Sequence, residues 1–223
     1  MPGFDIEQLI RVLSIALIPG LFAITLHEVS HGWAAKRLGD PTAFMLGRLS
    51  LNPLKHIDPL GTVVVPIAML LMSGGAMAFG WAKPVPVAFG NLRKPRRDMI
   101  LVAAAGPSSN LLMATGWALV AASMLAIPGL GGGAAQWLLG VCVFGIQINV
   151  ILAVFNMLPI PPLDGGRVLS GLLPPNASRV VDQIEPYGFV IVIVLMVTGV
   201  LWTFLEPFML FFNDFFWSLA GLR

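Results

Sequence analysis

Long apolar runs separated by short polar segments dominate the pattern of this chain. A helix needs about 20 apolar residues to cross the hydrocarbon core of a membrane. Four runs reach that length, at residues 9–38, 99–127, 134–158 and 187–205. The pattern therefore predicts four transmembrane helices. Only the Gly-rich turn at 128–133 separates the second run from the third, so we expect these two helices to be antiparallel neighbours.

The two ends of the chain extend this prediction. The first run is too long for the core of a signal peptide and no small-residue cleavage site follows it, so we expect a retained membrane helix. Glu206-Pro207 is expected to break the fourth run. Residues 208–222 then mix Phe and Trp with Asn and Asp, which is typical of a helix at the membrane interface.

A fifth apolar run, residues 61–81, is ambiguous. Pro66 interrupts it and Gly74-Gly75 is expected to break it. Residues 81–87 follow with alternating prolines, which exclude a helix but suit an edge strand. A helix that enters and a strand that leaves would form a re-entrant element. A complete crossing is the alternative.

Basic residues favour the re-entrant reading. The turn at 128–133 has no basic residue. Basic residues gather instead in the loop after the first run and in the segment before the second: Lys36, Arg37, Arg48, Lys55, Lys83, Arg93, Lys94, Arg96 and Arg97. Under the positive-inside rule both basic segments are cytoplasmic. Residues 61–81 must then enter and leave by the same face of the membrane.

Composition supports a membrane protein. Charged residues make up 11% of the 223 residues, hydrophobic residues make up 57%, and the mean hydropathy is +0.87. Soluble domains carry about 25% charged residues, so a water-soluble domain and a disordered chain are both excluded. The net charge of +2 is too small to indicate a nucleic-acid partner. The single cysteine, Cys142, is expected to be a packing residue.

No repeat or linker divides the chain. We therefore expect an all-α polytopic membrane protein with one membrane-embedded domain over residues 1–223. Its core would span about 9–167, followed by C-terminal helices over about 186–222.

His27, Glu28 and His31 fit the pattern H-E-x-x-H at the end of the first apolar run. Positions i and i+4 share one face of a helix, so both imidazoles can bind one metal ion, with Glu28 as general base. Ionisable groups at membrane depth cost about 2.5–3.5 kcal/mol each, which makes them functional candidates. The alternative is that they only mark the helix end before Lys36 and Arg37.

A catalytic zinc ion usually has three protein ligands and an open fourth position. Asp164 is one candidate for the third ligand, because prolines end the preceding apolar helix and Gly165-Gly166 permit a tight turn. An ordinary turn is the alternative for this segment. The other candidates are expected to be solvated or paired: His56 in a polar loop, and Asp40, Asp58 and Asp98 beside basic residues.

Three motifs in this order resemble the site-2 protease family of intramembrane zinc metalloproteases. They are the H-E-x-x-H pattern, Gly106-Pro107-Ser108-Ser109-Asn110, and residues 156–166. The loop at 52–59 and the segment at 80–87 are similar to the compact members without a PDZ domain. The resemblance covers about three-quarters of the chain, from the first apolar run to Arg167.

The resemblance implies one catalytic Zn2+ ion held by His27, His31 and Asp164, with Glu28 activating a water molecule. It also implies that Asn156 contacts the substrate backbone or the developing oxyanion. Asn110 is expected to pack and hydrogen-bond between helices rather than to contact substrate.

The expected function is hydrolysis of peptide bonds in or near transmembrane segments, with the active site toward the cytoplasmic side of the cell membrane. A single-span membrane protein or a leftover signal peptide would be the substrate, and Val85 and Val87 of the expected strand would pair with its unwound backbone. A catalytically silent metal-binding scaffold is one alternative, which the intact Glu28 disfavours. A metal or proton transporter is another, but it should carry ionisable groups along several helices.

Overall fold

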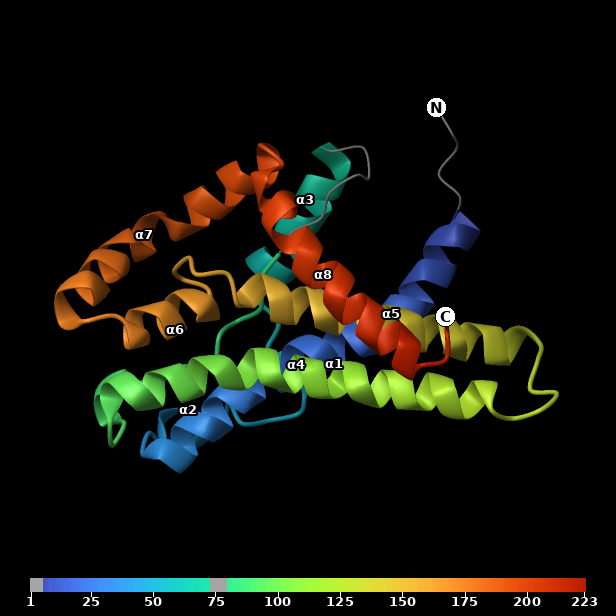
Figure 1. Ribbon diagram of the computed structural model, residues 1–223, viewed down its shortest axis with the longest axis horizontal. Coiled ribbons are helices and arrows are strands. Elements are labelled where there is room, and N and C mark those ends of the chain that lie inside the picture. The colour runs from blue at the N-terminus through green and yellow to red at the C-terminus, as the bar shows by residue number, and fades with distance from the viewer. Residues whose placement is uncertain (1–5, 73–79) are drawn as a thin grey trace.

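The computed structural model describes residues 6–72 and 80–223 and is built from helices (Figure 1). Four helices are long and apolar enough to cross a membrane: α1 (Ile6–Leu38), α4 (Pro95–Leu125), α5 (Gly133–Asn156) and α7 (Pro175–Val197). The predicted all-α, multi-pass membrane protein is therefore confirmed.

Shorter elements connect or cover these four helices. They are α2 (Thr42–Met45), η1 (Pro53–Lys55), η2 (Pro59–Val64), α3 (Val65–Met72), η3 (Phe89–Asn91), α6 (Asp164–Leu172) and α8 (Val200–Leu219).

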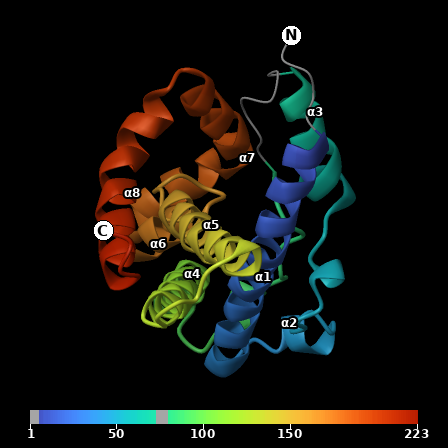
Figure 2. The ribbon, with the colours of Figure 1, turned by 90° about the vertical axis from the view of Figure 1, so that its right-hand side faces the viewer.

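Helix α4 lies at the centre of the packing, against α1, α5 and α6 (Figure 2). Its buried face toward α5 carries Ala114, Ala118 and Ala121, and small residues at this spacing let two membrane helices approach closely. Cys142 of α5 is fully buried in the same cluster, which confirms its predicted packing role. Helix α8 completes this core from the C-terminal end.

The predicted boundary of the fourth run is wrong. Helix α7 ends at Val197 and α8 begins at Val200, whereas the sequence pattern placed the break at Glu206-Pro207. The break occurs at Gly199, which has a φ of +76°, a left-handed conformation that glycine adopts without steric cost. Pro207 lies inside α8 and does not end the helix.

The ambiguous run at 61–81 begins and ends at one place. The backbone N–H of Trp81 donates a hydrogen bond of 3.0 Å to the carbonyl oxygen of Gly61. A complete crossing would separate its ends by about 30 Å. The meeting of the two ends therefore favours the re-entrant reading. The predicted break at Gly74-Gly75 lies outside the described residues.

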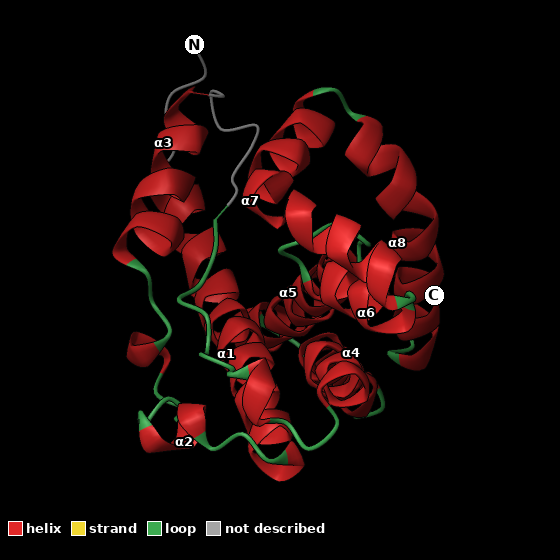
Figure 3. Cartoon of the chain, turned by 90° about the vertical axis from the view of Figure 1, so that its left-hand side faces the viewer, coloured by secondary structure: helices red, strands yellow, loops and turns green. Residues whose placement is uncertain are grey.

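The predicted strand at 81–87 is wrong. The chain is extended there, but no strand is present among the described residues (Figure 3). Its N–H groups bond to groups from different segments: Trp81 to the Gly61 carbonyl, Lys83 to the His56 carbonyl, and Val85 to the Glu28 carboxylate. Because no single neighbouring strand runs alongside, a ladder cannot form.

Candidate metal centre

Three side chains converge between α1, α4 and the start of α6. His27 and His31 lie one turn apart on α1, and their Nε2 atoms are 3.0 Å apart. Asp164 is the first residue of α6, and its Oδ2 atom lies 3.2 Å from Nε2 of His27 and 3.3 Å from Nε2 of His31. The structure thus brings together the three residues proposed from the sequence as metal ligands.

The hydrogen-bond partners of the two Nδ1 atoms decide whether each Nε2 atom carries a hydrogen or a lone pair. Nδ1 of His27 lies 2.6 Å from Oδ1 of Asn110, and Nδ1 of His31 lies 2.7 Å from the carbonyl oxygen of Val102. A carbonyl oxygen only accepts, so each Nδ1 carries the hydrogen and each neutral imidazole has a lone pair at Nε2. Oδ2 of Asp164 is also an acceptor, and it is buried without a hydrogen-bond partner.

Three acceptor atoms that face one another are suited to bind one cation between them. Zinc bonds of about 2.0–2.1 Å at tetrahedral angles would place neighbouring ligand atoms about 3.3 Å apart, close to the spacings of 3.0, 3.2 and 3.3 Å in this cluster. Two imidazoles and one carboxylate are also the ligand types of many catalytic zinc sites. The residues therefore fit zinc.

Gly106 gives the two imidazoles their space. A Cβ atom at this position would lie 2.3 Å from Nε2 of His31 and 2.7 Å from Cε1 of His27. Helix α4 therefore passes against the two imidazoles at the one residue type that leaves room for them. This contact explains the glycine of the Gly106-Pro107 motif.

The turn that carries Asp164 depends on close backbone approach. A Cβ at Gly165 would lie 2.2 Å from the carbonyl oxygen of Met157, and one at Gly166 would lie 2.4 Å from the backbone nitrogen of Pro161. Neither glycine has a positive φ. The two glycines therefore fold the start of α6 onto the preceding turn, which directs Asp164 toward α1.

Asp164 lies in the first turn of α6, where the helix dipole favours a negative charge on its carboxyl.

Glu28 contacts the extended segment that follows the re-entrant run. Its Oε2 atom accepts a hydrogen bond of 2.7 Å from the backbone N–H of Val85. Gly32, one turn further along α1, permits this approach, because a Cβ there would lie 2.8 Å from Cγ1 of Val85. The extended segment therefore crosses α1 over Glu28 and Gly32.

Asn156 is the last residue of α5, and its amide donates a hydrogen bond of 2.9 Å to the carbonyl oxygen of Leu152 in the same helix. This contact does not test the role suggested by the resemblance, which stays a prediction.

The residues expected to be solvated instead serve the polypeptide backbone. His56 is buried, and its Nε2 lies 2.8 Å from the Ser50 carbonyl oxygen. Asp40 and Asp98 are buried as well and accept from backbone N–H groups of Ala88 and Lys94. The expectation of a solvated side chain was wrong for His56, which donates to the loop backbone. Asp40 and Asp98, expected to be solvated or paired, are buried and accept from backbone N–H groups, which need such partners where loops pack against helices.

Asn149 was not singled out from the sequence. It is fully buried in α5, and its Oδ1 accepts a hydrogen bond of 2.9 Å from Asn110. The available signal was an amide inside an apolar membrane helix, where polar side chains commonly bond to a neighbouring helix.

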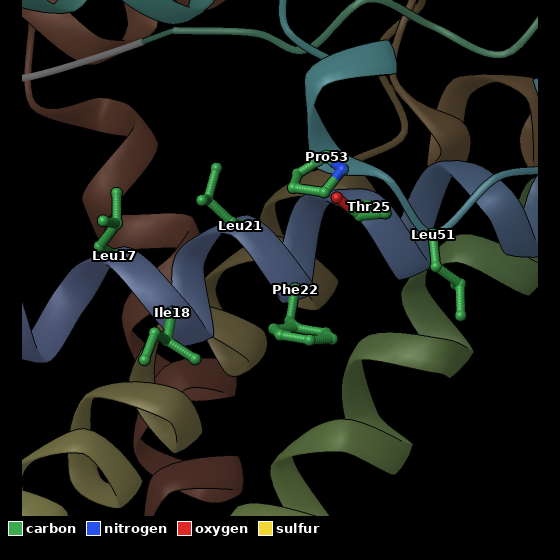
Figure 4. A pocket seen from close by; sticks show the side chains of 7 residues that line it. All are labelled: Leu17, Ile18, Leu21, Phe22, Thr25, Leu51 and Pro53. Atoms are coloured by element: carbon green, nitrogen blue, oxygen red, sulfur yellow. The ribbon is translucent and has the colours of Figure 1, made fainter.

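An apolar hollow of about 130 Å³ lies on α1 ahead of His27 and His31 (Figure 4). Five of its lining residues belong to α1, and two belong to the segment after α2, where η1 begins: Leu17, Ile18, Leu21, Phe22, Thr25, Leu51 and Pro53. Leu21 and Glu28 are two turns apart, so they share a face of the helix. The hollow and Glu28 therefore lie along one face of α1.

Known proteins are similar to this chain over most of its length. Peptidase family M50 matches residues 117–199. The protein YwhC of Bacillus subtilis, named as a zinc metalloprotease, is 38% identical over 206 residues, covering 88% of each chain. Rip2 of Mycolicibacterium smegmatis, named likewise, is 30% identical over 212 residues, covering 92% of this chain and 75% of Rip2. No solved structure is significantly similar.

Proposed function

Because this chain belongs to peptidase family M50 and is a zinc metalloprotease, we propose that His27, His31 and Asp164 hold its zinc ion and that Glu28 is its general base. The observation that carries the proposal is the convergence of three acceptor atoms within 3.0–3.3 Å of one another. Without a cation these lone pairs would repel one another, so the arrangement is costly unless it serves metal binding.

Bound zinc supplies a Lewis acid that polarises the scissile carbonyl and lowers the pKa of water toward about 7. Glu28 takes the proton of the attacking water and later passes it to the leaving amine. The hydrogen bond from the Val85 N–H fixes one oxygen of this carboxylate and leaves the other for proton transfer.

We propose that the substrate is a transmembrane segment of a single-span membrane protein or a leftover signal peptide. All backbone groups of a membrane helix are paired within the helix, so the substrate must unwind before it can be cut. The apolar hollow on α1 suits an apolar side chain of such a segment and lies on the face that leads to Glu28. Asn156, at the end of α5, is proposed to bind the unwound backbone.

We place the protein in the cell membrane with the active site toward the cytoplasm, as one membrane-embedded domain acting in regulated intramembrane proteolysis. The basic residues Lys36 and Arg37 support this orientation, because they end α1 just after His31.

The test is cleavage of a single-span reporter by the full chain in lipid nanodiscs, with zinc content measured in parallel. Glu28→Gln should retain zinc and lose cleavage, whereas Asp164→Ala should lose both. Glu185→Gln is the matched control, because Glu185 pairs with Arg167 on α6 at a partly exposed position. Continued cleavage by Glu28→Gln would overturn the assignment of the base.

A further inference from the structure

A chain of buried hydrogen bonds leads from His27 into α4 and α5. Oδ1 of Asn110 lies 2.6 Å from Nδ1 of His27. The Asn110 amide nitrogen donates to the Ala23 carbonyl oxygen at 3.2 Å and to Oδ1 of Asn149 at 2.9 Å. The Asn149 amide nitrogen donates in turn to the Gly145 carbonyl oxygen at 2.8 Å.

The carbonyl oxygens of Ala23 and Gly145 fix the orientation of the two asparagine amides. If the Asn149 amide were turned over, its oxygen would face the Gly145 oxygen. If the Asn110 amide were turned over, its oxygen would face the oxygens of Ala23 and Asn149. Each reversal places acceptors against acceptors in a buried site, where an unmade hydrogen bond is costly. Only one orientation therefore satisfies every group.

That orientation presents an acceptor, and never a donor, to His27. The hydrogen of the neutral imidazole must then sit on Nδ1, which leaves the lone pair on Nε2 facing Asp164 and His31. A reversed Asn110 would offer its N–H group, place the hydrogen on Nε2 and remove this metal-ligand lone pair.

His31 reaches the same state by a simpler route, because its Nδ1 bonds directly to the backbone carbonyl of Val102. A backbone carbonyl cannot turn over. The partner of His27 is instead the side-chain amide of Asn110, which can turn over. The tautomer of His27 therefore depends on the groups that hold this amide in place.

We propose that Asn110 and Asn149 are positioning residues that hold His27 in the tautomer that binds metal. The proposal rests on the proposed ligand role of His27. Both asparagines are fully buried in apolar membrane helices, where a polar side chain without partners is costly. Their hydrogen bonds join α1, α4 and α5, so the same contacts that pack the three helices also set the state of the ligand.

The tautomer can be measured directly, because the chain contains only three histidines. Zinc-free protein labelled with nitrogen-15 at histidine should show His27 with the hydrogen on Nδ1. Asn149→Leu keeps the volume but removes the nearer of the two acceptors that hold Asn110, leaving only the Ala23 carbonyl at 3.2 Å, so a minor population with the hydrogen on Nε2 should appear. Asn149→Asp as a neutral acid can accept from Asn110 with one oxygen and donate its O–H to the Gly145 carbonyl with the other, so it should keep the wild-type tautomer.

Zinc affinity, measured by chelator competition, gives a second readout. Loss of such outer hydrogen-bond partners commonly weakens metal binding by about 10–100-fold, and we expect about this loss for Asn110→Leu and a smaller loss for Asn149→Leu. The double variant should bind zinc as weakly as Asn110→Leu alone, because Asn149 acts through Asn110.

Val150→Ala is the matched control. Val150 is fully buried beside Asn149 in the apolar core, so its truncation should lower the unfolding temperature without changing the tautomer or the zinc affinity. An unchanged His27 tautomer and zinc affinity in Asn149→Leu would overturn the inference. So would equal weakening of zinc binding by Val150→Ala. Failure of the proposed function would differ, since His27→Ala would then bind zinc like the wild-type protein.

Discussion

The carboxylate of Glu28 accepts a hydrogen bond of 2.7 Å from the backbone N–H of Val85. This contact joins the proposed general base on α1 to the extended segment that we expected to pair with substrate. The N–H of Val85 is therefore already engaged, and a substrate backbone could use it only by displacing Glu28.

Val85→Pro removes this N–H group, and the change should reduce cleavage without releasing zinc. A hydrogen bond to a charged group contributes about 1.5–3 kcal/mol, so its loss from the transition state would lower kcat by about tenfold or more. The measurement is kcat and zinc content of each variant with a single-span reporter. Val85→Ala keeps the N–H group and should retain most of the activity.

Val87→Pro separates two explanations for that result. If the segment acts mainly by orienting Glu28, Val87→Pro should cleave almost normally. If the segment pairs with substrate as a strand, both prolines should raise KM, and equal losses in the two variants would favour that alternative.

Gly106→Ala should weaken zinc binding, because the added methyl group would lie 2.3 Å from Nε2 of His31. Overpacking of this kind costs about 1–3 kcal/mol, which corresponds to about a 5–150-fold loss of affinity. Chelator competition provides the measurement. Gly116→Ala on the same helix has open space around its Cβ position and should bind zinc normally. Equal affinity of the two variants would contradict the close contact of α4 with the ligands.

Asp40 should make the stability of the protein depend on pH. Burial raises the pKa of its carboxyl, but hydrogen bonds from Thr42, Asn91 and Ala88 lower it further, below the ordinary value of 3.8. A lowered pKa in the folded state stabilises the fold fully above the unfolded value and loses this effect as pH falls through the folded pKa.

The change that tests this is Asp40→Asn, which should lower the free energy of unfolding by about 1–3 kcal/mol at pH 7, because an amide places a donor against a donor. Thermal unfolding in detergent between pH 7 and pH 3 is the measurement. The difference in unfolding temperature between the wild type and Asp40→Asn should become smaller below about pH 4. A gap that stays constant with pH would contradict the charged state of Asp40.

Removal of zinc should destabilise the wild-type protein more than it destabilises the Asp164→Ala variant. A ligand that binds only the folded state at 100 times its Kd adds about 2.7 kcal/mol to stability. The chelator phenanthroline should therefore lower the unfolding temperature of the wild type and leave that of Asp164→Ala unchanged. Added zinc should restore the unfolding temperature of the wild type. An equal decrease in both proteins would contradict the place of Asp164 in the metal site.

Much of the site follows from local sequence rules. The i, i+4 spacing places His27 and His31 on one helical face whatever the rest of the chain does, and the length of the apolar runs determines α1, α4 and α5. The turn around Asp164 made it a candidate, but no local signal separates a ligand from an ordinary turn 133 residues from His31, and the site-2 protease resemblance favoured the ligand role.

Errors arose where a local pattern had to compete with tertiary contacts. Prolines at 84 and 86 indicated a strand, but pairing requires a neighbour, and the nearby N–H acceptors come from Gly61, His56 and Glu28. Pro207 indicated a helix end, but the chain turned at Gly199 instead. His56 was expected to be solvated in a polar loop and Asp40 to be solvated or paired beside basic residues, but both are buried. The 83–91 segment bonds to both residues, through Lys83 to the His56 carbonyl and through Ala88 and Asn91 to the Asp40 carboxylate.

By itself the sequence determined that this chain carries helices long and apolar enough to cross a membrane, with two imidazoles on one face of the first and a glutamate beside them, because hydropathy and helical spacing act over a few neighbouring residues. Only the tertiary structure decided which hydrogen bonds surround those groups. Helices α1, α4 and α5 must pack before Asn110 and Asn149 can set the hydrogen of His27, and the 80–88 segment must cross α1 before Val85 can hold Glu28. Such contacts depend on distance in space, which sequence separation does not encode.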